Sequence, residues 1–200
     1  MRRLKLAVIS VLHLEMVDPR LPDRLSIDVP DDADALMLAG DVHVGEKGVE
    51  WAASRHPGIP IFYVAGNHEF YGLDRLSTIE RLRAAAAATD NVRFLENEEN
   101  GVDVGGRRLT VLGCTLWTDF RLHGEAHEPI AKANLAKGLN DFRLIREGAR
   151  TFTPSHAAEA HRESRGWLRR RLSVPVADDE TRVVMTHHGV SNCCQPEIYR

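Results

Sequence analysis

The sequence has few cysteines, and their arrangement argues against a fold built on disulfide bonds. Only Cys114, Cys193 and Cys194 are present among 200 residues, an odd number in which two are adjacent. There is no Cys-x-x-Cys pair, so we do not expect a cysteine-based zinc site either. We therefore expect reduced thiols, which are typical of a cytoplasmic protein.

Long apolar runs and an excess of one charge are also missing. The first apolar run, residues 4–9, is too short to span a bilayer and lacks the cleavage site of a signal peptide, so we expect no membrane association. Lysine and arginine number 26, and aspartate and glutamate number 29, which gives a net charge of -3. This balance lacks the basic surface of a dedicated nucleic-acid-binding protein.

The chain does have the composition of an ordinary globular domain. Hydrophobic residues make up 43% and charged residues 28%, and the length suits a single domain over residues 1–200. Short apolar, β-branched runs predict strands at residues 4–10, 35–39, 59–64, 92–95, 102–104, 108–113 and 181–186. Helical patterns predict helices at residues 46–55, 73–88, 129–137 and 155–172.

The order of these segments predicts an α/β fold. Strands and helices alternate in the first half, which indicates a parallel sheet with crossover helices. In the middle, Gly105 and Gly106 separate two strands and predict a β-hairpin. A sandwich of two sheets covered by helices accommodates both features. Residues 18–34, rich in proline and aspartate, predict a surface loop.

Polar side chains follow several of the predicted strands. His13 follows the first strand and Asp41 the second, Asn67 and His68 follow the third, and the pair His187-His188 closes the last. Because ligands bind at the carboxyl ends of strands in open α/β sheets, we expect these residues to converge. Each piece alone has an ordinary explanation, such as a turn, a helix cap or a solvated histidine. Their combination and order favour a binding site.

These segments resemble the calcineurin-like metallophosphoesterases. The resemblance extends over nearly the whole chain and rests on residues 10–13 (SVLH), 40–41 (GD), 66–72 (GNHEFYG), 115–122 (TLWTDFRL), 140–142 (NDF) and 186–188 (THH). It implies the α/β/β/α two-sheet sandwich of that family and the hydrolysis of a small phosphomonoester or phosphodiester by a metal-activated water. Two cations serve this reaction by neutralising the phosphate oxygens and lowering the pKa of water.

The resemblance also implies roles for single residues. Asp41 matches the carboxylate that bridges two metals, and His13 matches a ligand of the first metal. Asn67 and His187 match ligands of the second metal, with His188 left open as an alternative to His187. His68 matches a histidine that binds no metal and either donates a proton to the leaving oxygen or stabilises the phosphoryl charge. Such mixed nitrogen and oxygen ligands suit Mn, Fe, Zn or Co rather than calcium.

Two departures from the family pattern remove metal ligands. Val11 occupies the position of the aspartate in Asp-x-His, and no Gly-His-x-His follows before Arg200. The first metal retains only His13 and Asp41, so we expect at most one metal, at the second position and weakly bound. Glu15, Asp18 and His43 are the nearby residues able to substitute.

These departures leave alternatives open. The chain is an impaired metallophosphoesterase, a catalytically inactive binding or scaffold protein with the same fold, or part of a longer protein. Because the family's last strands lie beyond the THH segment, we expect a truncated second sheet whose exposed edge supports a homo-oligomer. Trp117, Asp119, Phe120 and Arg121 either line a substrate pocket or form a packed surface loop.

Overall fold

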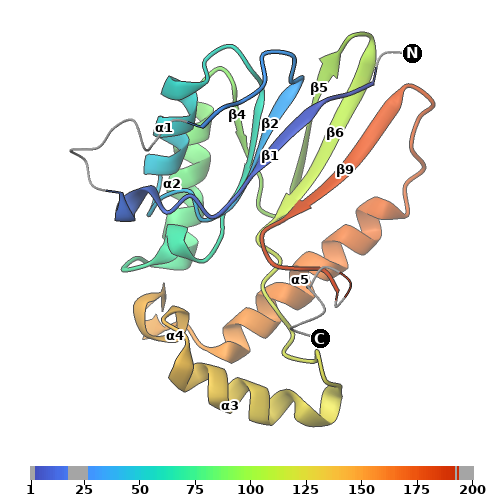
Figure 1. The fold of residues 1–200 in the computed structure, drawn as a ribbon. Coiled ribbons are helices and arrows are strands. Elements are labelled where there is room, and N and C mark those ends of the chain that lie inside the picture. The colour runs from blue at the N-terminus through green and yellow to red at the C-terminus, as the bar shows by residue number, and fades with distance from the viewer. Residues whose placement is uncertain (1–2, 18–26, 192, 194–200) are drawn as a thin grey trace.

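Two β-sheets pack face to face in the computed structural model, which describes residues 3–17, 27–191 and 193. Helices cover the outer face of each sheet, so the layers run helix, sheet, sheet, helix (Figure 1). The predicted α/β two-sheet sandwich is therefore confirmed.

The first sheet is fully parallel, and its strands lie in chain order. Its elements are β1 (Leu6–Ile9), β2 (Ala35–Ala39), β3 (Ile61–Val64) and β4 (Val92–Phe94), with the helices α1 (Lys47–Arg55) and α2 (Arg75–Ala87). Leu36 and Leu38 pack in the same cluster as residues of both helices, whereas Met37 packs against the second sheet. Burial on both faces explains why these strands are continuously apolar.

The second sheet combines a hairpin with a parallel strand. Its elements are β5 (Glu98–Val104), β6 (Arg107–Cys114) and β9 (Glu180–Thr186), in the order β5-β6-β9. Gly105 and Gly106 form the predicted hairpin turn, both with positive φ. The helix α5 (Pro154–Leu172) covers the outer face, where Leu168 packs against Leu112 and Cys114. Burial raises the pKa of the Cys114 thiol to about 12, so this cysteine stays protonated.

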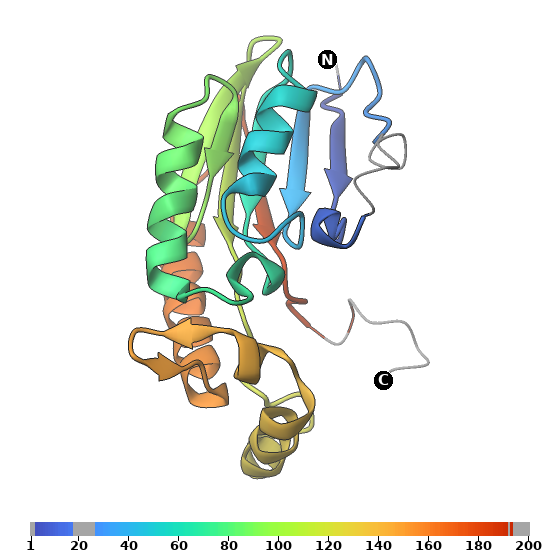
Figure 2. The ribbon, with the colours of Figure 1, turned by 90° about the vertical axis from the view of Figure 1, so that its left-hand side faces the viewer.

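The segment between β6 and α5 extends the fold beyond the sheets, below them in Figure 1 and at the bottom of Figure 2. It contains η4 (Glu125–His127), α3 (Glu128–Gly138), α4 (Asp141–Leu144), β7 (Arg146–Glu147) and β8 (Arg150–Thr151). The four predicted helices and seven predicted strands are all present, most within two residues of the predicted ends. The predictions missed α4 and the β7–β8 hairpin, because such short elements show no periodicity.

The second sheet has free edges at β5 and β9 within the described residues. Two valines on edge strands are exposed: Val8 of β1, in the first sheet, is 65% exposed, and Val184 of β9, in the second sheet, is 39% exposed. The homo-oligomer expected from such an edge stays a prediction.

No helix of the described ranges combines the length and the apolar character needed to cross a membrane. Asp18 and Cys194 lie outside the described residues, as does most of the predicted loop at 18–34, of which residues 27–34 contain no helix or strand.

Asp74 begins α2 and ties it to the hairpin. Its Oδ1 accepts a hydrogen bond from the Ser77 amide at 2.9 Å, and its Oδ2 accepts one from the Gly148 amide. The Ser77 hydrogen bond holds the pKa of Asp74 below its usual range against a weaker effect of burial. We expect Asp74→Ala to lower the free energy of unfolding by about 1 kcal/mol and the melting temperature by roughly 2–4 °C.

Urea unfolding at several pH values measures this effect. Because the folded pKa is lowered, the stabilisation is present at neutral pH and is lost as the pH falls below about 3.9 and through the folded pKa. Asp74→Asn keeps the cap to Ser77 and is expected to lose less than the alanine variant. Equal stability of wild type and Asp74→Ala at neutral pH would contradict the assignment.

Candidate metal centre

The loops after β2 and β3 are joined by one buried carboxylate. Glu69, in η3 (His68–Phe70), is fully buried and accepts four hydrogen bonds. Its Oε2 accepts from the amides of Asp41 at 3.0 Å and Gly66 at 2.7 Å, and its Oε1 accepts from the Val42 amide at 2.9 Å and the Tyr63 hydroxyl at 2.8 Å. Burial and the nearby Asp41 charge raise the pKa of Glu69, and the hydrogen bonds from Val42, Tyr63 and Gly66 oppose that shift. The carboxylate thus fixes the two loops relative to each other.

Two glycines allow the loops to approach the last strand closely. A Cβ atom on Gly40, whose φ is +84°, would lie 2.5 Å from Nδ1 of His187. A Cβ atom on Gly66 would lie 2.2 Å from Oδ1 of Asp41 and 2.7 Å from Cε1 of His187. Neither position tolerates a side chain, so the Gly-Asp and Gly-Asn-His-Glu segments bring Asp41 and His187 together.

Asp41 lies between two imidazole rings. Its Oδ1 accepts a hydrogen bond from the His68 amide at 2.9 Å. The other oxygen, Oδ2, lies 3.6 Å from Nε2 of His187 and 4.0 Å from Nε2 of His13. This is the position expected of a carboxylate oxygen shared by two cation sites.

His187 directs its Nε2 atom at Asp41. Its Nδ1 lies 2.9 Å from the Ala39 carbonyl oxygen, which only accepts hydrogen bonds, so Nδ1 carries a proton. Nε2 faces Oδ2 of Asp41 at 3.6 Å. In the neutral ring this nitrogen offers a lone pair to a cation.

Asn67 adds a third oxygen or nitrogen donor atom to this pair. Its Nδ2 donates to the Tyr71 hydroxyl at 3.0 Å and to Oδ1 of Asp141 at 2.9 Å, and Tyr71 donates to the same Asp141 oxygen at 2.7 Å. This orientation leaves Oδ1 of Asn67 3.3 Å from Nε2 of His187. Burial and the Asp141 contact raise the pKa of Tyr71, which keeps it a donor. Three converging lone pairs fit a divalent cation with water as a fourth ligand.

A second set of donor atoms lies on the other side of Asp41. One ligand atom each from His13, Asp41 and His68 fall within 4.8 Å of one another. The structure therefore adds His68, which the sequence predicts to bind no metal, to the two donors expected at the first position. Of the suggested substitutes, Glu15 lies beside His68, with Oε1 2.9 Å from Nδ1 of that ring. His43 is not in the set, and burial lowers its pKa.

His188 contacts Thr115 and Trp117. Its amide and its Nδ1 both contact the Thr115 carbonyl oxygen, at 3.2 and 3.1 Å, and its ring stacks on Trp117 with centroids 5.3 Å apart. Burial and the neighbouring His187 lower the pKa of His188 to about 4, so it is neutral at physiological pH. Of the two histidines left open by the sequence, the geometry favours His187 as the ligand.

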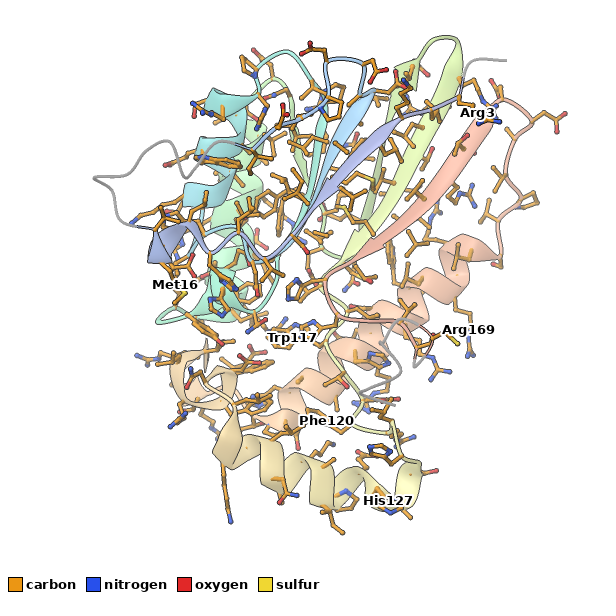
Figure 3. The ribbon with its side chains drawn as sticks, viewed as in Figure 1. Arg3, Met16, Trp117, Phe120, His127 and Arg169 are labelled. Atoms are coloured by element: carbon orange, nitrogen blue, oxygen red, sulfur yellow. The ribbon has the colours of Figure 1, made fainter. Side chains whose placement is uncertain are left out.

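A cavity of about 890 Å³ adjoins His187 and His188. Trp117, Asp119 and Arg121 line it, whereas Phe120 is buried and points toward α3 (Figure 3). Arg121 is paired with Glu128, with Nε 2.6 Å from Oε2. Leu116, Trp117 and Phe120 all have positive φ values, a strained conformation of the kind that often occurs at functional sites.

The family is shown by comparison with known proteins. A family model described as calcineurin-like phosphoesterase matches residues 5–199. The chain belongs to this family. Members of the family use divalent metals, in agreement with the donor atoms around Asp41.

Two known proteins are similar to this calcineurin-like phosphoesterase. An uncharacterized protein, L509, of Acanthamoeba polyphaga mimivirus is 26% identical over 157 residues, which are 71% of this chain and 52% of that protein. The chain thus spans about half the length of this curated relative. The crystal structure of the phosphopantetheinyl hydrolase PptH from Mycobacterium tuberculosis aligns with a TM-score of 0.68 at 19% identity, over 92% of this chain and 68% of that one. At this identity the likeness shows the fold alone.

Val11, two residues before His13, has a backbone conformation that is unfavourable for a β-branched residue. Its φ is 60°, a left-handed value that costs an L-residue roughly 1–2 kcal/mol and a β-branched residue most. Since its side chain is 55% exposed, little packing is lost on replacement. We expect Val11→Asn to raise the free energy of unfolding by about 1 kcal/mol, because asparagine adopts this conformation readily.

Differential scanning calorimetry tests this expectation, with a rise in melting temperature of roughly 2–4 °C. Val8→Asn is the control, because Val8 is also largely exposed, 65% against 55% for Val11, but lies within the strand β1, where asparagine is disfavoured. The account of Val11 is wrong if both variants melt at or below the wild-type temperature.

Glu69→Gln tests the carboxylate that joins the loops. The NH2 group of glutamine would face N–H and O–H donors from which the carboxylate accepts hydrogen bonds, so those bonds are lost. We therefore expect a loss of about 1–3 kcal/mol in the free energy of unfolding. The same change is expected to weaken Mn²⁺ binding, since the loops carrying Asp41 and Asn67 lose their connection.

Isothermal titration with Mn²⁺ and urea unfolding measure the two effects. Glu96→Gln is the control, because Glu96 is also a buried carboxylate but bonds Thr115 in the second sheet. We expect Glu96→Gln to lose stability and retain Mn²⁺ affinity. Unchanged Mn²⁺ affinity in Glu69→Gln would show that Glu69 does not shape the centre.

Proposed function

We propose that this chain is a metal-dependent phosphoesterase that hydrolyses a small phosphate ester. Membership of the calcineurin-like phosphoesterase family supports the reaction class. The observation that carries the proposal is the position of Oδ2 of Asp41, 3.6 Å from Nε2 of His187 and 4.0 Å from Nε2 of His13. Carboxylate oxygen and imidazole nitrogen atoms that converge in this way suit a divalent transition-metal cation.

The residues of this centre would have different roles. Asp41, Asn67 and His187 would hold one divalent ion, of Mn, Fe, Zn or Co, which supplies charge neutralisation at the phosphoryl oxygens and a lower pKa for the attacking water. His13 would share a second, weaker position with Asp41. His68, 22% exposed in its side chain, lies beside this position, where its protonated ring would give a proton to the leaving oxygen or stabilise the phosphoryl charge. The substrate's alcohol group would occupy the cavity beside Trp117.

A second candidate function is binding without catalysis. Val11 favours it, because that residue offers no donor atom to the position shared by His13 and Asp41. The two candidates differ in hydrolysis, whereas both are compatible with one bound cation.

Hydrolysis of bis(p-nitrophenyl) phosphate with added Mn²⁺ tests the proposal. We expect turnover that EDTA abolishes and that Asp41→Asn lowers by about 100-fold or more, because the shared ligand is lost. His68→Ala is expected to lower kcat by roughly 10²–10⁴, the usual contribution of a proton donor.

Asp34→Asn provides the matched control, because Asp34 is nearly as buried as Asp41 (8% against 6% exposed) but bonds the Lys5 amide at the other end of the sheet. Its activity is expected to match the wild type. Hydrolysis that persists at the same rate in Asp41→Asn would assign the activity to a contaminant, and a bound cation without any turnover would support the binding function.

A further inference from the structure

Glu15 faces the same ring nitrogen of two histidines. It lies in η1 (Leu14–Met16), and its side chain is 18% exposed. Its Oε1 lies 2.9 Å from Nδ1 of His68 and 3.4 Å from Nδ1 of His13. Among the described residues Nδ1 of His13 is buried and makes no hydrogen bond, so Oε1 is the polar group positioned to hold it.

The backbone holds Glu15 in this place. His13 has a φ of 47°, and its amide and that of Leu12 both donate to the Asp41 carbonyl oxygen, at 3.0 and 2.8 Å. The Leu14 amide donates to the Val42 carbonyl oxygen at 2.9 Å. The segment that carries Glu15 is therefore fastened to the loop that carries Asp41.

The contact decides which nitrogen each ring offers to the centre. A carboxylate accepts hydrogen bonds only, so the 2.9 Å contact places the proton of neutral His68 on Nδ1. The same oxygen favours a proton on Nδ1 of His13. In both rings Nε2 is then left with its lone pair, and in His13 this atom is the one 4.0 Å from Oδ2 of Asp41.

The ring of His68 also packs against two other rings. Its centroid lies 4.1 Å from that of His13 and 4.2 Å from that of Tyr71, both in tilted arrangements. Packing of this kind restricts movement of the ring but does not select a tautomer. The selection between Nδ1–H and Nε2–H therefore depends on Glu15.

We propose that Glu15 is a positioning residue that serves both histidines, fixing them in the Nδ1–H form and so directing Nε2 of His13 at the position beside Asp41. This inference rests on the proposed metal-dependent function. The first segment of the chain, which has no carboxylate at Val11, thus supplies one four residues later, as an outer partner of the ligands. Carboxylates that accept the second N–H of a ligating histidine orient the ring and raise its basicity.

Long-range ¹H–¹⁵N NMR of histidine-labelled, metal-free protein at neutral pH measures the tautomers directly. In the wild type we expect His13, His68 and His187 all as Nδ1–H. In Glu15→Gln we expect His13 and His68 to lose this preference, because a glutamine amide both donates and accepts. His187 is an internal control, since its Nδ1 partner is the Ala39 carbonyl oxygen.

A Zn²⁺ titration followed by the same spectra measures the consequence at each ring. We expect Glu15→Gln to require about 10–100-fold more Zn²⁺ to shift Nε2 of His13, with the His187 response unchanged. Glu147→Gln is the matched variant, because Glu147 has the same exposure, 19%, but pairs with Arg75 outside the centre. It is expected to behave as the wild type.

The outcomes separate this inference from the proposed function. Nε2–H tautomers at His13 and His68 in the wild type overturn it, as does a Zn²⁺ response of His13 that Glu15→Gln leaves within about threefold of the wild type, well short of the expected loss. If Glu15→Gln does not fold, the wild-type tautomers alone decide. A protein with the expected tautomers and Zn²⁺ responses that hydrolyses no phosphate ester refutes the enzyme and leaves the role of Glu15 standing.

Discussion

The buried carboxylate of Glu69 is the constraint on which the rest of the centre depends. It brings no atom to the cation position, yet it accepts the amides of Asp41, Val42 and Gly66 and so joins the ends of two neighbouring strands. Full burial makes an unpaired carboxylate very unfavourable, so the four hydrogen bonds form together or the loops separate. Asp41, on one loop, and Asn67, on the other, are placed relative to each other by this residue.

Around that connection, a shell of partners selects which atom each ligand presents. The Ala39 carbonyl oxygen fixes the tautomer of His187, and Asp141 with Tyr71 orients the amide of Asn67. These contacts turn the side-chain oxygen and nitrogen atoms toward one point. A cation there would bind atoms that are already oriented, so a small change in the outer partners is expected to alter metal affinity.

Much of the fold and of the candidate site follows from the sequence. Buried parallel strands are apolar throughout, so β2 and β3 are evident, and Asp41, Asn67 and His187 follow strand ends. Asp141 lies in the segment 140–142 that carries part of the resemblance, but the sequence does not reveal its partner Asn67, 74 residues away, because only the folded chain brings them together. The role of Glu69 was missed for a different reason. It lies in the Gly-Asn-His-Glu segment, but the residue type alone does not show whether a glutamate is buried or exposed. The choice between His187 and His188 as the candidate ligand also needs the folded structure, because it depends on which of the two rings contacts Thr115 and Trp117.

The central claim, that a divalent cation binds at Oδ2 of Asp41, is tested most directly by anomalous diffraction from crystals soaked in Zn²⁺. The account predicts an anomalous peak about 2.0–2.2 Å from Oδ2 of Asp41 and from Nε2 of His187. Zinc peaks elsewhere on the protein, with none beside Asp41, would contradict it.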